Sequence, residues 1–582
     1  MVDTRLLVRG GATALALALA ATACGGSSST KNNSASSGST SGTGTNAIFQ
    51  PSEKKGGNLQ ILATSDCDFW DPARPYYANC WDMDRLLFRG LMMYDAKPGA
   101  AGTKVLPDLA ATDPVVTDNL KTWKYTLKDN LKFQDGTPVT SQSVKYGIER
   151  VFAQDVLSNG PTYLLDLLVG GKAYKGPYKD KKGLASIETP DSKTLIFHLT
   201  RPFSDFNYVM AIPQSTPVPQ AKDTGANYTF HPVANGPYKI ASYTPNKSMT
   251  MVRNPNWDPA TDKVRKALPD TITITMGLDP NDIDNRIISN QGDVFQDQTG
   301  VQQAAQAKVL TTPALKDRSE NPITGFLRYL VVFQKNKPFD NIHCRNAVAW
   351  VVNKKAQQLV RGGPVGGGAI ATTMITPTLK FYQPFDLFPS DGGQGNVAKA
   401  KEELKACGHP NGFSTKLAIR NKGKEPKQGE AIQADLKKIG INATIDTYDI
   451  SQYYAAHLGI PANVHKSGYG MGLTAWGPDW PSPYGYFNAI VDGRKILPQG
   501  NSNYGELNSA TVDANMDKAL ATADPAAQQA AWTAVDKGVV SSAVYVPLLY
   551  DKALNLNSQR TTNAYVQQAF GMTDFVSLGV IP

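Results

Sequence analysis

The first 46 residues limit which part of the chain can form a folded body. Arg5 and Arg9 precede an apolar run from Ala12 to Ala20, and small residues then lead to Cys24, an arrangement typical of a secretory signal. The apolar run is too short to cross a bilayer. Residues 25–46 are almost wholly Ser, Thr, Gly and Asn, a composition that behaves as a flexible tether. The residues beyond position 57, about 525, are enough for two or more lobes.

The residues that end at Cys24 resemble the lipobox of bacterial lipoproteins, although Ala21 stands where Leu is usual. The resemblance implies cleavage before Cys24, a lipid on this cysteine, and attachment to the outer face of the cell membrane or a periplasmic location. The alternative is ordinary secretion, with cleavage near Ala23.

Four cysteines remain after Cys24, an even number that can pair fully outside the cell. The short interval favours Cys67 with Cys80, which leaves Cys344 with Cys407, but the connectivity stays open. No Cys-x-x-Cys pair occurs, and the histidines do not lie at zinc-ligand spacing. We therefore expect two disulfides and no metal.

Charge and hydropathy argue against nucleic-acid binding and against a membrane-spanning segment in the body. Cleavage before Cys24 lowers the formal net charge from +9 only to +8, and the lysines form no basic block, so nucleic-acid binding is not expected. No run of 18 apolar residues follows Cys24, so we expect a soluble body.

Strand and helix patterns alternate along the body. Residues 123–128 and 194–199 alternate apolar and polar side chains and predict half-buried strands. Residues 429–440 predict a helix that ends at a glycine, with Ile432, Leu436 and Ile439 on one face, and residues 441–445 predict a strand. This order indicates an α/β lobe with helices covering a sheet.

Several motifs occur in an order that resembles the extracytoplasmic solute-binding proteins of peptide-type ABC importers, the oligopeptide- and dipeptide-binding family 5. The most specific is residues 123–144, a strand, a Lys-Phe-x-Asp-Gly-Thr-Pro turn and a helix start. The other matching segments are Asn235-Gly-Pro-Tyr238, Arg253-Asn-Pro-Asn-Trp257, Lys337-Pro-Phe-Asp340, Arg345-Asn-Ala-Val-Ala349 and residues 398–406.

The signature segment has a structural explanation. Gly136 tolerates a positive φ in the turn, and Thr137 or Ser141 can cap the following helix. We expect Lys132 to be solvated and Phe133 to be buried. The segment therefore identifies the fold rather than the ligand site.

The resemblance implies an α/β fold of two lobes, a class II periplasmic-binding-protein-like clamshell with an extra subdomain in the N-terminal lobe. Crossover strands near residues 324–333 and 543–549 would join the lobes. The implied division is a signal peptide at 1–23, a tether at 24–57, lobe I with the extra subdomain at 58–323, lobe II at 324–545, and a return to lobe I at 546–582.

The main site candidate is the segment Trp476-Gly-Pro-Asp479-Trp480-Pro. Relatives carry Trp-x-x-Asp here, and in peptide binders the aspartate pairs with the α-ammonium of the ligand. The resemblance thus implies Asp479 as the anchor, although the aspartate could simply stabilise its own turn. Trp476 and Trp480 could stack on a sugar face as readily as on a peptide, which keeps an oligosaccharide as the alternative ligand.

A second candidate cluster lies in residues 65–82, where the family carries a Leu-Asp-Pro element matched by Trp70-Asp71-Pro72. The loop after the first strand commonly lines the cleft in this family, and a Cys67–Cys80 bridge would stiffen it. We expect Trp70, Tyr76, Tyr77 and Trp81 to face the ligand, with lobe core as the alternative for each. The carboxylate spacing lacks the glycine and terminal glutamate of a calcium loop.

The function implied is capture of oligopeptides and delivery to an ABC permease with cytoplasmic ATPase subunits, by a monomer without a cofactor. No nucleophile elbow, His-Glu-x-x-His or Walker loop is present, which argues against a secreted hydrolase. A surface receptor that senses peptides would use the same fold.

Overall fold

The computed structural model of the chain describes residues 48–449 and 452–581. The predicted signal peptide at 1–23, Cys24 and most of the predicted tether at 24–57 lie outside these residues. Within the described residues, no helix is both long and apolar enough to cross a membrane.

Lobe I contains a five-stranded sheet in the order β11-β1-β10-β9-β8, in which β1 runs parallel to both its neighbours and the remaining pairs are antiparallel. Ile61 of β1 lies opposite Ile274 of β10, and both are fully buried. Together with Met249 and Met251 they pack against Trp81 of the helix that follows β1. The strands are β1 (Asn58–Leu62), β8 (Tyr238–Thr244), β9 (Ser248–Arg253), β10 (Thr271–Thr275) and β11 (Val294–Phe295).

A second sheet of lobe I, in the order β4-β5-β7-β6, is antiparallel throughout. The predicted strands at 123–128 and 194–199 are confirmed as β5 and β7, which are neighbours. The four strands are β4 (Val115–Thr117), β5 (Thr122–Thr126), β6 (Ile187–Glu188) and β7 (Thr194–His198).

The signature turn after β5 behaves largely as expected. Gly136 has a φ of +88°, Phe133 is 1% exposed, and Lys132 is exposed. The predicted cap is wrong, because α2 (Ser141–Arg150) is capped by Thr140. The Thr140 hydroxyl accepts from the Ser143 backbone N–H at 3.3 Å, and the Ser143 hydroxyl accepts from the Thr140 N–H at 2.9 Å, which forms a capping box.

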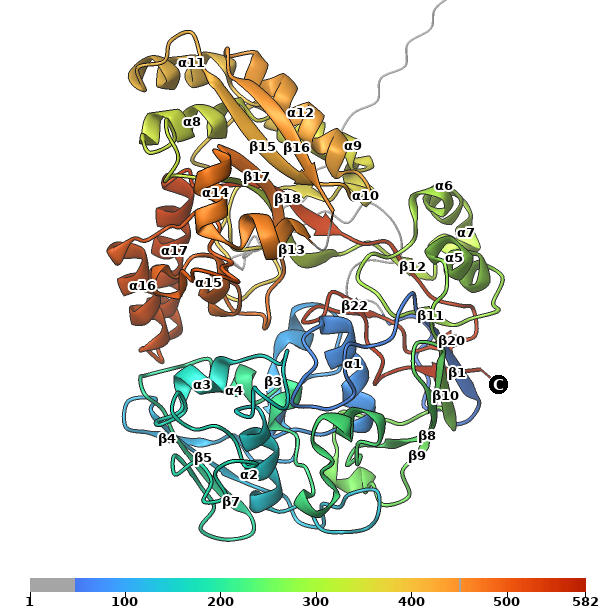
Figure 1. The fold of residues 1–582 in the computed structure, drawn as a ribbon. Helices are drawn as coiled ribbons and strands as arrows, with labels where there is room; N and C mark the ends of the chain where they lie inside the picture. The colour runs from blue at the N-terminus through green and yellow to red at the C-terminus, as the bar shows by residue number, and fades with distance from the viewer. Residues whose placement is uncertain (1–47, 450–451, 582) are drawn as a thin grey trace, which may run out of the picture. The chain divides into compact units, whose positions relative to one another are not determined.

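Lobe II contains a six-stranded mixed sheet in the order β14-β18-β13-β17-β15-β16. Alternate residues of β13 pack on opposite faces: Leu327, Tyr329 and Val331 against one core, Leu330 and Val332 against another. Helices α8, α11 and α12 cover one face, while α14, α15 and α17 cover the other (Figure 1). The strands are β13 (Ile323–Val332), β14 (Ala369–Ile370), β15 (Ser414–Arg420), β16 (Asn442–Tyr448), β17 (Met471–Trp476) and β18 (Tyr545–Lys552).

The predicted helix and strand at 429–445 are confirmed as α12 (Glu425–Lys437) and β16, with Ile432 and Leu436 fully buried. The other α-helices described in lobe II are α8 (Ile342–Val351), α9 (Lys354–Val360), α10 (Gly363–Gly366), α11 (Val397–Ala406), α14 (Pro461–Ser467), α15 (Tyr484–Ile490), α16 (Ala510–Leu520) and α17 (Pro525–Ser541).

Strands β13 and β18 pair with each other, and beyond them the chain continues as β12 (Ser319–Glu320) paired with β19 (Asn555–Leu556). The segment after β19 contacts lobe I: Gln567 Nε2 donates to the Asp95 carbonyl at 2.7 Å, and Ala564 bridges to Phe49.

The remaining strands are β2 (Met92–Tyr94), β3 (Val105–Pro107), β20 (Thr561–Thr562), β21 (Val566–Gln567), β22 (Met572–Thr573) and β23 (Gly579–Val580). The remaining helices are α1 (Ala78–Leu87), α3 (Tyr163–Leu167), α4 (Phe206–Val209), α5 (Pro280–Ile288), α6 (Gln303–Thr311) and α7 (Pro313–Lys316).

Candidate ligand-binding site

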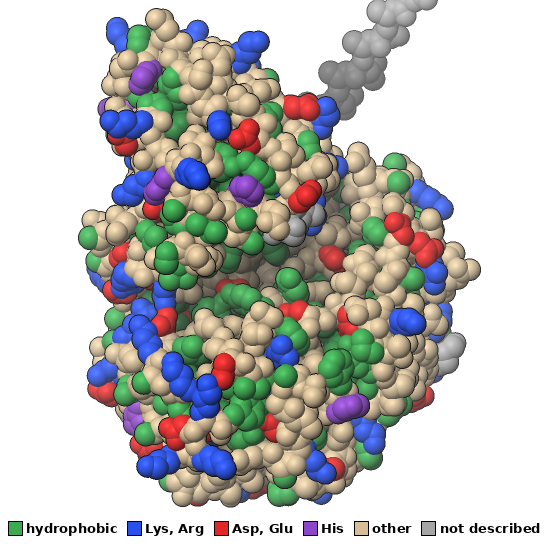
Figure 2. All heavy atoms as spheres, in the orientation of Figure 1, with side chains coloured by type: hydrophobic (Ala, Val, Ile, Leu, Met, Phe, Trp, Pro, Cys, Tyr) green, Lys and Arg blue, Asp and Glu red, His purple; other side chains and the backbone are tan. Residues whose placement is uncertain are grey.

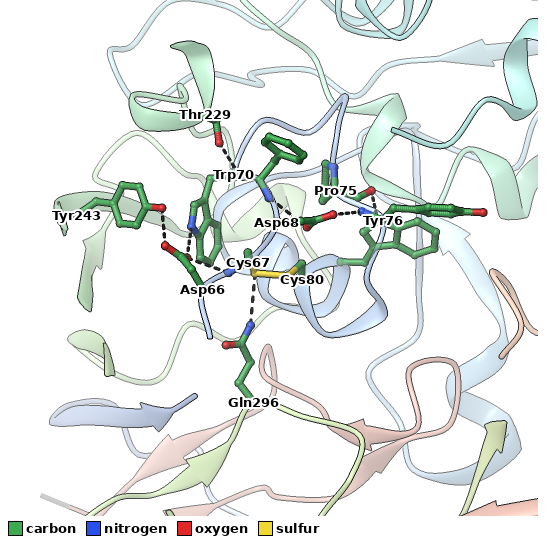
Figure 3. The surroundings of a disulfide bond; sticks show 12 residues. Asp66, Cys67, Asp68, Trp70, Pro75, Tyr76, Cys80, Thr229, Tyr243 and Gln296 are labelled. Atoms are coloured by element: carbon green, nitrogen blue, oxygen red, sulfur yellow. Dashed lines mark hydrogen bonds between the residues drawn. A yellow bond between two sulfur atoms is a disulfide. The ribbon is translucent and has the colours of Figure 1, made fainter. Parts of the chain in front are cut away.

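The loop between β1 and α1 holds Tyr76 in place. The structure joins Cys67 to Cys80, with their Cα atoms 5.5 Å apart. The Asp68 carboxylate accepts from the Tyr76 backbone N–H at 2.7 Å, and Trp81 Nε1 donates to the Pro75 carbonyl at 2.7 Å (Figure 3). With these contacts in place, residue Tyr76 is 41% exposed.

Asp479 lies in the loop that connects β17 to α15. Its backbone N–H donates to the Gly485 carbonyl at 3.0 Å, which closes the loop on itself. A Cβ at Gly477 would lie 2.6 Å from Phe326 Cζ, so the packing of the Phe326 ring against this loop favours glycine here. The loop conformation thus presents a half-buried Asp479 carboxylate beside lobe I.

Two tyrosines of lobe I contact the Asp479 carboxylate. Tyr163 donates a hydrogen bond to Oδ2, and Tyr76 donates to the same oxygen at 3.4 Å. The two hydroxyls are also 3.0 Å apart. No lysine, arginine or histidine of the described residues forms an ion pair with Asp479.

The Asp479 carboxyl has a shifted pKa. Burial raises the pKa of Asp479 to about 7, against the opposing effect of the hydrogen bonds from Tyr163 and Tyr76. A buried carboxylate without a cation is costly, and an ammonium ion placed beside it would offset that cost.

Two cavities adjoin this cluster, and Tyr76 lines both. The larger, of about 450 Å³, is within the range of small-molecule pockets. The smaller, of about 130 Å³, is lined mainly by aromatic and uncharged side chains, with Asp479 as its one charged residue. Figure 2 shows a hollow on this face of the molecule, between the regions that carry α15 and α1.

The residues predicted from the sequence divide into two groups. Trp480 lines the larger cavity, Tyr77 and Trp81 line the smaller one with Asp479, and Tyr76 lines both. Tyr77 is 63% exposed, which leaves its ring available to a ligand.

Trp70 and Trp476 line neither cavity. Trp70 is 1% exposed, and its Nε1 donates to the Asp66 carboxylate at 3.1 Å (Figure 3). Its ring packs edge-on against Tyr243 at 6.5 Å, so the structure places it in the core of lobe I, the alternative kept for it above. Trp476 pairs with Leu327 at the end of β17 and packs half-buried against the sheet core.

Sequence reasoning missed several residues of the site. Tyr163, from the short helix α3, touches Asp479, and Arg201 and Tyr484 line the larger cavity. No motif marks Tyr163, because its partner is 316 positions away in the sequence.

The structure also joins Cys344 to Cys407, whose Cα atoms are 5.2 Å apart. Within the described residues, these two sulfurs and His409 form the one group whose ligand atoms lie close enough to share a metal ion. Because both sulfurs are in the disulfide, they are not available as thiolate ligands. Cys24, the predicted lipid carrier, lies outside the described residues.

The two-lobed fold and the cavities where its lobes meet define a solute-binding protein. Residues 104–497 match the family described as bacterial extracellular solute-binding proteins, family 5 Middle, and this is more than half of the chain. The protein therefore belongs to family 5 of the bacterial extracellular solute-binding proteins, of the peptide ABC importer type.

Relatives agree in sequence and in fold. The chain is 26% identical over 483 residues to the glutathione-binding protein GsiB of Shigella dysenteriae serotype 1 (strain Sd197), covering 80% of this chain and 85% of that one. It is 41% identical, with a TM-score of 0.90, to the solved structure of clavulanic acid biosynthesis oligopeptide binding protein 2, over 93% of this chain and 99% of that one. The fold is also similar to that of DppA from Helicobacter pylori in complex with peptide STSA, with a TM-score of 0.70 and 18% identity over 91% and 99% of the two chains.

Proposed function

We propose that this protein captures short peptides between its lobes and delivers them to an ABC permease, with Asp479 as the anchor for the α-ammonium. The observation that carries the proposal is the environment of the Asp479 carboxylate. Its carboxylate is half-buried at a cavity wall, accepts hydrogen bonds from Tyr163 and Tyr76, and lacks a cationic partner among the described residues. The α-ammonium of a peptide supplies the missing charge and a charge-assisted hydrogen bond.

The relatives favour a peptide over an oligosaccharide. Their descriptions name glutathione, an oligopeptide and peptide STSA as ligands or ligand classes. The two tryptophans that motivated a sugar are poorly placed for stacking. Trp476 lines neither cavity, and Trp480 is 1% exposed with its Nε1 bonded to Asp205.

Transport requires that the ligand select one arrangement of the lobes. A ligand enclosed between lobes stabilises the closed arrangement only as far as it binds this arrangement better than the open one. We propose that a permease with cytoplasmic ATPase subunits recognises the closed form. We also propose that the protein performs no catalysis.

The proposal includes the membrane attachment of the protein and its division into lobes. A lipid on Cys24 and the tether at 24–57 hold a monomeric body at the outer face of the membrane. Lobe I spans 58–323, lobe II spans 324–545, and residues 546–582 return to lobe I.

The test is calorimetric titration of peptides into the chain expressed from Gly25, together with mass spectrometry of ligands that co-purify. We compare a tripeptide with its N-acetylated form, on the wild type, Asp479→Asn and the control Asp446→Asn. Asp446 of β16 is also half-buried, with a side chain 27% exposed, and it lines neither cavity.

The free peptide should lose about 2–5 kcal/mol of binding free energy in Asp479→Asn and little in Asp446→Asn. The acetylated peptide should bind weakly to all three proteins and be indifferent to Asp479. Equal binding of free and acetylated peptides, or binding of oligosaccharides alone, would refute the proposal.

A further inference from the structure

The larger cavity carries an excess of positive charge on its wall. Its lining includes four cationic side chains and one carboxylate, Asp166. The cations come from both lobes and are Lys172, Arg201, Arg494 and Lys495.

Three of these four cations have close carboxylate partners. Lys495 forms an ion pair with Asp166, and Lys172 lies 3.4 Å from the same carboxylate. Arg494 contacts Asp492 at 2.8 Å and Asp517 at 2.7 Å. Their charges are therefore largely compensated within the protein.

Arg201 is the exception. Its nearest carboxylate partner among the described residues is Asp517, at 3.8 Å, and Asp517 already contacts Arg494 at 2.7 Å. Its Nη2 donates to the Tyr484 hydroxyl at 2.7 Å, while the side chain remains 30% exposed. A guanidinium has five N–H donors in a planar arrangement that matches a carboxylate, so Arg201 keeps donors for a ligand.

A row of aromatic rings connects Arg201 to the Asp479 carboxylate. Arg201 bonds Tyr484, whose ring packs against Trp480 at 6.4 Å. Trp480 packs against Tyr163 at 4.9 Å, and Tyr163 donates to Asp479. This row of contacts therefore has the Asp479 carboxylate at one end, in the smaller cavity, and the Arg201 guanidinium at the other end, in the larger cavity, and Tyr76 lines both cavities.

We infer that Arg201 binds a carboxylate of the ligand, so that the protein selects short peptides carrying a carboxylate at a distance from their α-ammonium. This inference rests on the proposed function, because Asp479 is taken to hold the ammonium. The carboxylate is either the C-terminal group or an acidic side chain, since both present the same planar pair of oxygens.

The experiment varies the ligand carboxylate and Arg201 together. Calorimetry compares Ala-Ala-Ala with its C-terminal amide, and Ala-Glu-Ala-amide with Ala-Gln-Ala-amide, on the wild type and Arg201→Gln. The control is Arg286→Gln, because Arg286 of α5 has a similar side-chain exposure of 39%, forms an ion pair with Asp282 at 2.9 Å, and lines neither cavity.

Arg201→Gln should weaken binding of the ligand with the recognised carboxylate about tenfold or more, or about 1.4 kcal/mol. The matched amide or glutamine ligand should change little, and Arg286→Gln should bind every ligand as the wild type does. Loss confined to Ala-Ala-Ala identifies the C-terminal carboxylate, and loss confined to Ala-Glu-Ala-amide identifies the side chain.

Two results would overturn the inference while leaving the proposed function intact. One is wild-type affinity of Arg201→Gln for all four ligands. The other is an equal loss for charged and uncharged ligands, which would mean that Arg201 acts only by supporting Tyr484. Either result overturns the inference alone only if the binding of free peptides still depends on Asp479. If the wild type binds no peptide, the proposed function fails and the inference fails with it.

Arg201→Lys serves as the second variant if Arg201→Gln does not fold. It keeps the charge but loses the planar fork, so it should lose part of the preference for the carboxylate ligand. An unchanged preference in Arg201→Lys would contradict bidentate recognition.

Discussion

Trp480 donates a hydrogen bond from Nε1 to Oδ2 of Asp205 at 2.9 Å, and both residues are buried. Ser482 donates its hydroxyl to the same oxygen. Asp205 belongs to lobe I, whereas Trp480 and Ser482 lie on the loop that carries Asp479. This carboxylate therefore joins the anchor loop to the opposite lobe.

Replacing Asp205 tests that connection. Asp205→Ala leaves the indole N–H and the Ser482 hydroxyl without an acceptor, which should lower the free energy of unfolding by about 2–4 kcal/mol. Urea unfolding followed by fluorescence measures the loss. Asp205→Asn retains one acceptor oxygen and should lose less; a loss below about 0.5 kcal/mol in the alanine variant would show that the connection contributes little.

Peptide affinity should depend on pH through Asp479. The pKa of this carboxyl in the folded protein is raised to about 7 from its ordinary 3.8. The folded state therefore binds more protons than the unfolded state between about pH 4 and 7, so this group lowers stability as pH rises through that window. An ammonium ligand pairs with the ionised form alone, so affinity should fall by up to about tenfold per pH unit below 7.

The upper limit of this profile comes from the ligand. A peptide α-ammonium has a pKa of about 7.7–8.0, so affinity should be highest between about pH 7 and 8. Calorimetry from pH 5.5 to 8.5 measures the profile, and Asp479→Asn should flatten its acidic limb. Because burial also raises the pKa of Asp536 and Glu320 to about 7, the pH dependence of stability alone would not report on Asp479. A wild-type affinity that does not change between pH 5.5 and 7 would contradict this assignment.

The two disulfides should differ in their effect on binding. Cys67–Cys80 closes a 13-residue separation in the loop that positions Tyr76, whereas Cys344–Cys407 joins α8 to the end of α11 in lobe II. Replacing either pair with serines should cost about 3–4 kcal/mol of stability.

Only the loss of Cys67–Cys80 should also weaken peptide binding, because Tyr76 contacts Asp479. Calorimetry on the two double-serine variants, at a temperature where both are folded, makes the comparison. Equal weakening by both variants would indicate a general loss of rigidity rather than a local effect at Tyr76.

Asp71 should matter for stability and not for ligand contact. Its carboxylate pairs with the two terminal nitrogens of Arg150 at 2.6 and 2.7 Å, and both side chains are fully buried. Arg150 also pairs with the buried Asp223 at 3.0 Å, so Arg150→Met leaves two buried carboxylates without their cation and should cost about 3–5 kcal/mol.

The double variant Arg150→Met/Asp71→Leu should recover part of that stability, because it removes one of the two unpaired carboxylates, and Asp223 keeps its hydrogen bonds from Tyr146 and Tyr178. Urea unfolding measures both variants. Peptide affinity of the folded double variant should match the wild type; a specific loss of affinity would place Asp71 in the ligand site.

The strands at 123–128 and 194–199 and the helix at 429–440 were predictable because their periodicity is local. Side chains alternate along a strand and repeat every three to four positions along a helix, so the buried face can be predicted from residues close together in the sequence. The cap of α2 was misplaced by a residue or more, because Thr137, Thr140 and Ser141 are chemically equivalent candidates. Which hydroxyl accepts from a free backbone N–H depends on the backbone dihedral angles, and the local sequence does not specify these angles.

The sequence by itself determined the family, the α/β class and Asp479 as the candidate anchor, since these follow from ordered motifs and local patterns. Tertiary structure alone decided that Tyr163 and Arg201 join this site and that Trp70 belongs to the core. Residues 316 positions apart, such as Tyr163 and Asp479, meet only when the two lobes pack together. Burial of an aromatic ring depends in the same way on what the rest of the chain places against it.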